Sequence, residues 1–167
     1  MPVGVSAYTA LANVTLGSSA TTVTFSSISQ SYRDLVLVSN PISSSGSVQM
    51  LAQMNYLATA NYNFVYMQGN GSSATSGNFT GQFFFYLAYG DALVTTSAGL
   101  TMTANFMDYS ATDKNPSVLV RSSNASNGVY ASAQRFNGTG SIAHISLSLN
   151  GANFAAGSTF ALYGVSA

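Results

Sequence analysis

The stretch that decides the fold is residues 143–150, which read AHISLSLN. Apolar side chains at Ala143, Ile145, Leu147 and Leu149 alternate with polar side chains at the positions between them. Successive side chains of a β-strand point to opposite faces, so this period of two residues predicts a strand with one apolar and one polar face.

The same alternation recurs along most of the chain, and no segment carries the period of an amphipathic helix. Residues 35–38 and 82–89 are apolar on both faces instead, which is typical of strands covered on both sides. Asn127-Gly128 has the chemistry of a hairpin turn. Strands are predicted at 8–16, 21–28, 35–38, 48–54, 82–89, 101–106, 117–122, 129–134, 143–150 and 158–165.

These segments predict one all-β domain over residues 1–167, an antiparallel sandwich of about eight to ten strands. Residues 1–19 are expected to form an N-terminal arm or an edge strand of this domain. The longest loops are expected at 68–81 and 108–116, where glycine, asparagine and serine concentrate.

The composition is unusual in its lack of charge. Only 5% of residues are charged, with four basic and four acidic side chains, whereas soluble domains carry about 25%. Nucleic-acid binding and attachment to a membrane surface both need clusters of Lys and Arg, so we expect neither partner. The longest apolar run, 83–89, is far below the roughly 20 residues of a membrane helix. The chain has no Cys, which excludes disulfides and zinc–thiolate sites.

His144 is the only histidine, and it lies on the polar side of its alternating segment. A Ser-His-Asp triad would need this residue, but no Gly-x-Ser-x-Gly motif occurs, and a zinc site lacks a second His or Cys. We therefore expect an exposed strand histidine with no catalytic role. No catalytic, metal-binding or cofactor-binding residue is predicted, and the protein is not expected to be an enzyme.

The acidic residues leave two further chemistries open. Glycoside hydrolysis needs a pair of carboxylates, so a glycan-cleaving enzyme that uses Asp108 or Asp113 is a distant alternative. The same residues leave an oxygen-ligand calcium site open, although no EF-hand spacing is present. Asn-x-Ser/Thr sequons are about as frequent as the Ser and Thr content produces by chance, and they stand at Asn13, Asn70, Asn78, Asn124 and Asn137.

The ten tyrosines are expected to fill the core and a subunit interface. Residues 83–89 are apolar on both faces, and a sandwich covers one face only, so a partner subunit is expected to cover the other. The candidate interface residues are Phe84, Tyr86, Tyr62 and Tyr66. Alternatively, Tyr62, Tyr66 and the 68–81 segment bind a glycan, because tyrosine rings next to Asn and Ser suit carbohydrate.

Four segments of the chain, 32–38, 61–72, 106–119 and 153–164, resemble small β-rich virion proteins of tailed bacteriophages, including cyanophages. The resemblance spans roughly residues 20–167, and its C-terminal block is the most specific part. It implies a capsid decoration (cement) protein, a minor tail protein or a fibre module, commonly of jelly-roll type. It carries no catalytic residues, and this chain departs from it in having very few charges in its middle loops.

The expectation from the sequence is therefore a non-enzymatic virion structural protein, on the capsid exterior, that binds the outer shell and stabilises it. Its partners would be the major capsid protein and further copies of itself, as a trimer by the resemblance and the symmetry usual in such assemblies. The alternative is a tail-fibre or tail-tip module that binds a glycan of the host surface. Burial of uncharged β surface and pairing of edge strands would hold the assembly together.

Overall fold

The computed structural model describes residues 7–57, 59–97, 99–124 and 127–166. These ranges contain β-strands and no helix long and apolar enough to cross a membrane. The strands are β1 (Tyr8–Thr15), β2 (Thr22–Phe25), β3 (Asp34–Asn40), β4 (Met50–Met54), β5 (Tyr62–Gly69), β6 (Ala74–Gln82), β7 (Phe85–Ala88), β8 (Leu100–Met107), β9 (Ser117–Asn124), β10 (Gly128–Phe136), β11 (Ile145–Leu149) and β12 (Thr159–Val165).

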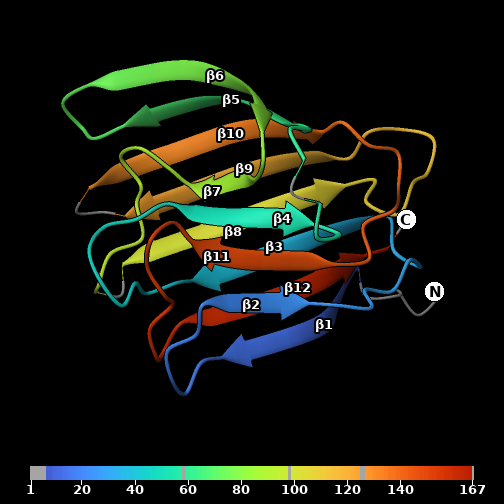
Figure 1. Ribbon diagram of the computed structural model, residues 1–167, viewed down its shortest axis with the longest axis horizontal. Coiled ribbons are helices and arrows are strands. Elements are labelled where there is room, and N and C mark those ends of the chain that lie inside the picture. The colour runs from blue at the N-terminus through green and yellow to red at the C-terminus, as the bar shows by residue number, and fades with distance from the viewer. Residues whose placement is uncertain (1–6, 58, 98, 125–126, 167) are drawn as a thin grey trace, which may run out of the picture.

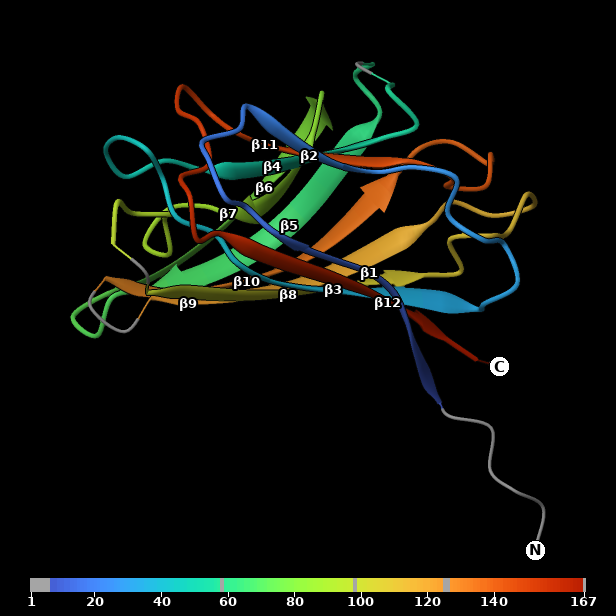
Figure 2. The same ribbon diagram turned by 90° about the horizontal axis from the view of Figure 1, so that it is seen from below.

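The strands form two antiparallel sheets that pack face to face (Figure 2). The larger sheet has eight strands in the order β1-β12-β3-β8-β9-β10-β5-β6, and the smaller has four in the order β2-β11-β4-β7. The prediction of an all-β antiparallel sandwich is confirmed.

The pairing of strands is nested along the chain. β1 pairs with β12, β2 with β11, β3 with β8 and β4 with β7, so the chain runs out and returns alongside itself. The nested ribbon is then rolled up, because β12 also pairs with β3 and β11 also pairs with β4. A ribbon rolled in this way into two facing sheets is the jelly-roll arrangement. We call these eight strands the closed half.

The remaining strands are insertions that widen one sheet only. β5 and β6 lie between β4 and β7 in the chain, and β9 and β10 lie between β8 and β11. All four join the larger sheet beyond β8, and Figure 1 shows β5 and β6 extending past β7, the last strand of the smaller sheet. In Figure 2, β10 and β5 rise out of the plane of the larger sheet toward the smaller one. We call β9, β10, β5 and β6 the wing.

The structure has more strands than the sequence predicts, because residues 62–82 form the hairpin β5–β6, and the loop expected at 68–81 is mostly β6. β5 ends at Gly69 and β6 begins at Ala74. Between them, Asn70 Oδ1 accepts hydrogen bonds from the backbone N–H groups of Ser72 and Ser73, both at 3.0 Å, and Gly71 takes a φ of 86°. The sequence predicts a loop here because β6 is a largely exposed edge strand, and such a strand has no apolar face that would produce an alternating pattern.

The hydrophobic core fills the space between the two sheets of the closed half. Strands β3 and β11 bury every second residue, as the sequence alternation requires, with Leu35 and Leu37 facing Ile145 and Leu147 in one continuous cluster. Phe106 and Phe160 are completely buried in the same cluster. This shared core makes the two sheets one packing unit.

The second face of β7, which the sequence predicts to be covered by a partner, is covered in part within the subunit. Phe85 and Leu87 are buried in the core, and Tyr86 and Tyr89 on the other side pack against β5. The wing therefore supplies part of the layer that a partner subunit was expected to supply.

The expected N-terminal arm is partly an edge strand. Within residues 1–19, β1 pairs with β12 at the edge of the larger sheet, with an irregular register between Ala10 and Ala12. Residues 1–6 lie outside the described part of the chain.

Candidate functional site

The outer face of the wing carries a groove that runs along β10. Ala131 and Ala133 form its floor, because each lies between larger side chains on the neighbouring strands. Ala131 faces Arg121 of β9 and Met67 of β5, and one step further along, Ala133 faces Leu119 of β9 and Val65 of β5. We call this feature the outer groove, with Ala131 and Ala133 as floor and Leu119, Arg121, Val65 and Met67 as walls.

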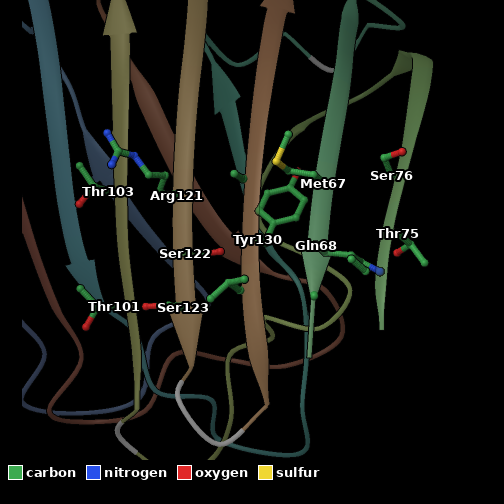
Figure 3. Close-up of a pocket in the computed structure, with 14 residues that line it drawn as sticks. Met67, Gln68, Thr75, Ser76, Thr101, Thr103, Arg121, Ser122, Ser123 and Tyr130 are labelled. Atoms are coloured by element: carbon green, nitrogen blue, oxygen red, sulfur yellow. The ribbon is translucent and has the colours of Figure 1, made fainter. Parts of the chain in front are cut away.

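The outer groove widens at the end near the β5–β6 turn. There it opens into a concavity of about 900 Å³ that reaches from Thr101 of β8 to Ala74 of β6. Figure 3 shows Arg121 and Thr103 on one side of this concavity and Met67 and Ser76 on the other. Small side chains line it because Gly69 and Ser123 stand where bulkier residues would fill the space.

Apart from Arg121, the walls of the outer groove are apolar, and their side chains are exposed. Val65 is 61%, Met67 66%, Leu119 45% and nearby Val129 57% exposed, and they lie on three adjacent strands. Single exposed apolar residues are normal on protein surfaces, but a contiguous set marks an interaction site. The groove is therefore suited to burying apolar surface of another molecule.

Charge on the outer groove is exclusively positive. Arg121 and Arg135 are both exposed on this face, and neither forms an ion pair with any residue that the structure describes. The described strand residues of the face include no aspartate.

Two ion pairs lie at one end of the larger sheet, where β3 begins and β8 ends. Arg33 Nη2 lies 2.7 Å from Asp34 Oδ2, and Lys114 Nζ lies 3.4 Å from Asp108 Oδ2. The backbone N–H of Asp108 also donates to Asp34 Oδ1 at 2.9 Å, and the Asp34 carboxylate raises the pKa of Arg33 through a hydrogen bond and its charge. In the ranges that the structure covers, no three acidic or histidine side chains come together as metal ligands. The Asp108 carboxylate faces Lys114 in this ion pair.

His144 is buried, not exposed as predicted from its place on the polar face. It is 6% exposed because the ring of Tyr56 lies over it, with the ring centroids 3.5 Å apart. Its backbone N–H donates to Asn55 Oδ1 at 3.1 Å, while Nε2 is buried without a partner among the described residues. Burial lowers the pKa of the imidazole. No described Ser or Asp side chain contacts it, so the arrangement is not that of a catalytic triad.

The four candidate interface residues fall in different environments. Tyr62 is completely buried, and its Oη accepts a hydrogen bond from the Met54 N–H and donates one to the Leu57 carbonyl, both at 3.0 Å. Burial raises the pKa of Tyr62, as expected for a core residue. It has no surface to offer a partner or a glycan, which corrects its assignment. Phe84 lies half-buried ahead of β7, while Tyr86 and Tyr66 are half-buried between β7 and the wing.

Tyr66 and Tyr86 belong to a larger aromatic cluster on the inner face of the wing. Tyr86 packs on Phe64 with ring centroids 5.1 Å apart, and Tyr89 packs on Tyr66 at 5.4 Å. Burial raises the pKa values of Tyr86 and Tyr89, and the neighbouring Tyr66 and Tyr86 phenols raise that of Tyr89 further. The members of this aromatic cluster are Phe64, Tyr66, Phe79, Tyr86, Tyr89 and Tyr130.

Sequence reasoning missed Phe79, Tyr89 and Gln134. The Gln134 amide binds the edge of β7, because its Oε1 accepts from the Tyr86 N–H at 3.0 Å and its Nε2 donates to the Tyr86 carbonyl at 2.6 Å. Its Nε2 also donates to Ser132 Oγ at 2.8 Å. This side chain thus fastens the smaller sheet to the wing. Its place on the inner face of β10 was visible in the alternation of 129–134, but its partner was not.

Comparisons with known proteins do not assign the chain to a family. No protein-family model matches it, and neither does any curated protein. One solved structure, an exo-inulinase from Aspergillus awamori, aligns with 96% of this chain and 29% of its own, at 13% identity and a TM-score of 0.38. The chain thus corresponds to less than a third of the length of that protein. A TM-score this low supports no argument about function.

Proposed function

We propose that the protein is a non-enzymatic structural component of a bacteriophage particle, a capsid decoration protein that binds the outer shell through the outer groove. The observation that carries the proposal is the contiguous, exposed apolar wall of that groove on an otherwise charge-poor surface. A monomer in solution gains nothing from such a surface, whereas a subunit fixed in an assembly buries it. The resemblance of four sequence segments to phage virion proteins supports the same function.

The edge strand β6 supports self-association of the protein. Its nine residues, Ala74–Gln82, are mostly exposed and include no charged residue and no proline. Natural proteins usually protect edge strands with such residues, because a bare edge offers its unpaired N–H and C=O groups to another strand. A partner strand that pairs with β6 would continue the larger sheet from one subunit into the next.

The decisive experiment is to locate the protein in purified particles by cryo-electron microscopy. We expect density at many symmetry-related positions on the shell, with the outer groove facing the major capsid protein. Density confined to the tail would overturn the decoration role and favour the tail-module alternative.

A matched pair of variants tests the role of the outer groove. Met67→Asp places a carboxylate in its wall, and Thr24→Asp places the same group on the exposed face of β2 in the smaller sheet. We expect Met67→Asp to reduce incorporation into particles at least tenfold and Thr24→Asp to leave it unchanged, with both proteins folded by circular dichroism. Equal incorporation of the two variants would exclude the groove as the attachment surface.

A further inference from the structure

A second cavity lies on the opposite side of the wing, beside the aromatic cluster, and we propose that it binds a neutral saccharide. It has a volume of about 390 Å³, in the range of roughly 300–1,000 Å³ typical of small-molecule sites. Four chain segments meet there and contribute Tyr66 from β5, Tyr89 after β7, Gln49 before β4 and Asn150 after β11. We call it the neutral cavity.

The aromatic wall of the neutral cavity consists of two tyrosines at a steep angle to one another. The rings of Tyr66 and Tyr89 are 5.4 Å apart between centroids and inclined by 66°. Tyr66 lies across β6 at Gly77, where a Cβ atom would come within 2.9 Å of the phenol oxygen. Rings fixed in this way present apolar surface on which the C–H face of a sugar ring can pack, with the phenol groups at its rim.

Polar groups around the neutral cavity have unused hydrogen-bonding capacity. Asn150 Nδ2 donates to Gln49 Oε1 at 2.9 Å, which leaves Gln49 Nε2 and Asn150 Oδ1 without partners among the described residues. The phenol groups of Tyr66 and Tyr89 likewise form no hydrogen bond within the described chain. A ligand with several hydroxyl groups, each both donor and acceptor, matches this set.

Gln68 adds an amide to the lining of the neutral cavity, and its oxygen has no partner among the described residues. Its Oε1 is buried against Gly90 and accepts no hydrogen bond, a condition that costs free energy in a folded protein. Gly90 makes this position possible, because a Cβ atom there would overlap the Gln68 amide. If the Gln68 side chain turned toward the neutral cavity, its Oε1 could accept a hydrogen bond from a hydroxyl group of a ligand.

The absence of charge narrows the class of ligand. None of the residues that line the neutral cavity is Asp, Glu, Lys, Arg or His. A phosphate, a carboxylate or a cation would have to shed water without an opposite charge to replace it. Neutral hexoses lose only hydroxyl–water hydrogen bonds, which the phenols and amides restore. The same aromatic and amide chemistry that excludes ions therefore favours an uncharged sugar.

The test is isothermal titration of the full-length protein with maltotriose, cellotriose and, as the charged counterpart, trigalacturonate. We expect one or both neutral trisaccharides to bind and trigalacturonate not to bind. Tyr89→Ala should lower the affinity about tenfold through loss of the packing surface, and Tyr89→Phe by only about threefold through loss of the hydroxyl. Gly90→Ala, which displaces the Gln68 amide, should also weaken binding.

The control is Tyr8→Ala, which removes an exposed tyrosine from β1 at the far edge of the larger sheet. It should bind like the unaltered protein. Gln49→Ala changes a half-buried surface side chain, so it tests the cavity even if Tyr89→Ala fails to fold. Failure of both neutral trisaccharides to bind, preference for trigalacturonate, or equal affinity of Gln49→Ala and the unaltered protein would overturn the proposal. Because the neutral cavity and the outer groove are on opposite faces of the wing, neither result bears on the decoration role.

Discussion

The closed half and the wing are both built from antiparallel strands, but they bury their apolar side chains in different ways. In the closed half, two sheets face each other, and aliphatic and phenylalanine side chains fill the space between them. In the wing, the larger sheet continues past β7, so its inner face is covered only in part and its outer face not at all. Tyrosines occupy the partly covered face, since their rings pack while their hydroxyls reach water.

The two regions also differ in how strongly packing constrains their residues. The closed half depends on a continuous core, so its residues are constrained by packing. The wing contributes Val118, Val120 and Phe136 to that core, but its outer face and the part of its inner face beyond β7 remain available for partners. Both proposed sites lie there, which is consistent with an inserted pair of hairpins that adds surfaces to a jelly roll without altering its core.

The largest effect should come from emptying the core of the closed half. Phe106 is completely buried, so Phe106→Ala should lower the free energy of unfolding by about 3–5 kcal/mol, through lost transfer energy and an unfilled cavity. Phe79, in the wing, is only half-buried, and Phe79→Ala should cost clearly less. Urea denaturation of both variants checks the order, and a larger loss for Phe79→Ala would show that the wing carries the stability instead.

The next largest loss of stability should come from breaking the contact between the wing and β7 of the closed half. Gln134→Leu removes the amide that binds the N–H and C=O of Tyr86, so the N–H loses its partner and the carbonyl keeps only the longer hydrogen bond from Tyr130 Oη, at 3.4 Å. We expect a loss of about 1–3 kcal/mol, the cost of an unsatisfied buried polar group. The control is Gln82→Leu, since the exposed Gln82 side chain bonds only to the Thr80 carbonyl two residues away.

Hydrogen exchange locates the effect of Gln134→Leu more sharply than a global measurement. We expect faster exchange in β7 and β5, with the strands of the closed half still protected. Uniformly faster exchange throughout the chain would mean that the wing and the closed half unfold together, and that the distinction between them does not extend to stability.

Local alternation predicted the strands of the closed half well, because each of them has a buried face. Ile145 and Leu147 alternate with polar residues, and they lie in the core as that pattern requires. β6 was missed for the opposite reason, since an edge strand exposed on most of its length has no apolar period to detect. Of the wing, the sequence therefore predicts β9 and β10 but neither β5 nor β6.

The candidate sites depended on contacts between distant segments, which no local pattern contains. Ala131 and Ala133 form a groove only because the register places larger residues beside them on β9 and β5. His144 follows the alternation of its segment but is covered by Tyr56, a residue of a turn with a φ of 57°. The sequence identifies Tyr66 as a candidate site residue, whereas Tyr89 is recognised as its neighbour only in the folded structure.

A smaller effect should follow from the buried imidazole of the closed half. Burial lowers the pKa of His144, so the folded protein keeps it neutral while the unfolded chain takes up a proton near the ordinary value of about 6.5. Its contribution to stability is therefore fully present above that pH and is lost as the pH falls through the folded-state pKa. The melting temperature should fall between about pH 7.5 and about pH 5.

The variant His144→Gln separates this contribution from that of the carboxylates, because glutamine does not titrate. Its melting temperature should change less over the same pH range than that of the unaltered protein. Identical pH profiles for the two proteins would mean that the ring is protonated without leaving the contact with Tyr56. The expected pH response belongs to the closed half alone, since His144 is the only histidine and the wing has no group that titrates in this range.

The smallest effect on folding should come from substitutions in the outer groove, where a loss of binding and a loss of stability can be told apart. Met67 and Leu119 are 66% and 45% exposed, so the double variant Met67→Ser/Leu119→Ser should change the free energy of unfolding by less than about 1 kcal/mol, the sum of two surface substitutions. Binding to particles should nevertheless weaken strongly, because the same side chains form the walls of the groove. Cosedimentation with particles and urea denaturation, on one preparation of the protein, measure binding and stability. If stability fell and binding did not, the apolar walls would be serving the fold of the wing and not a partner.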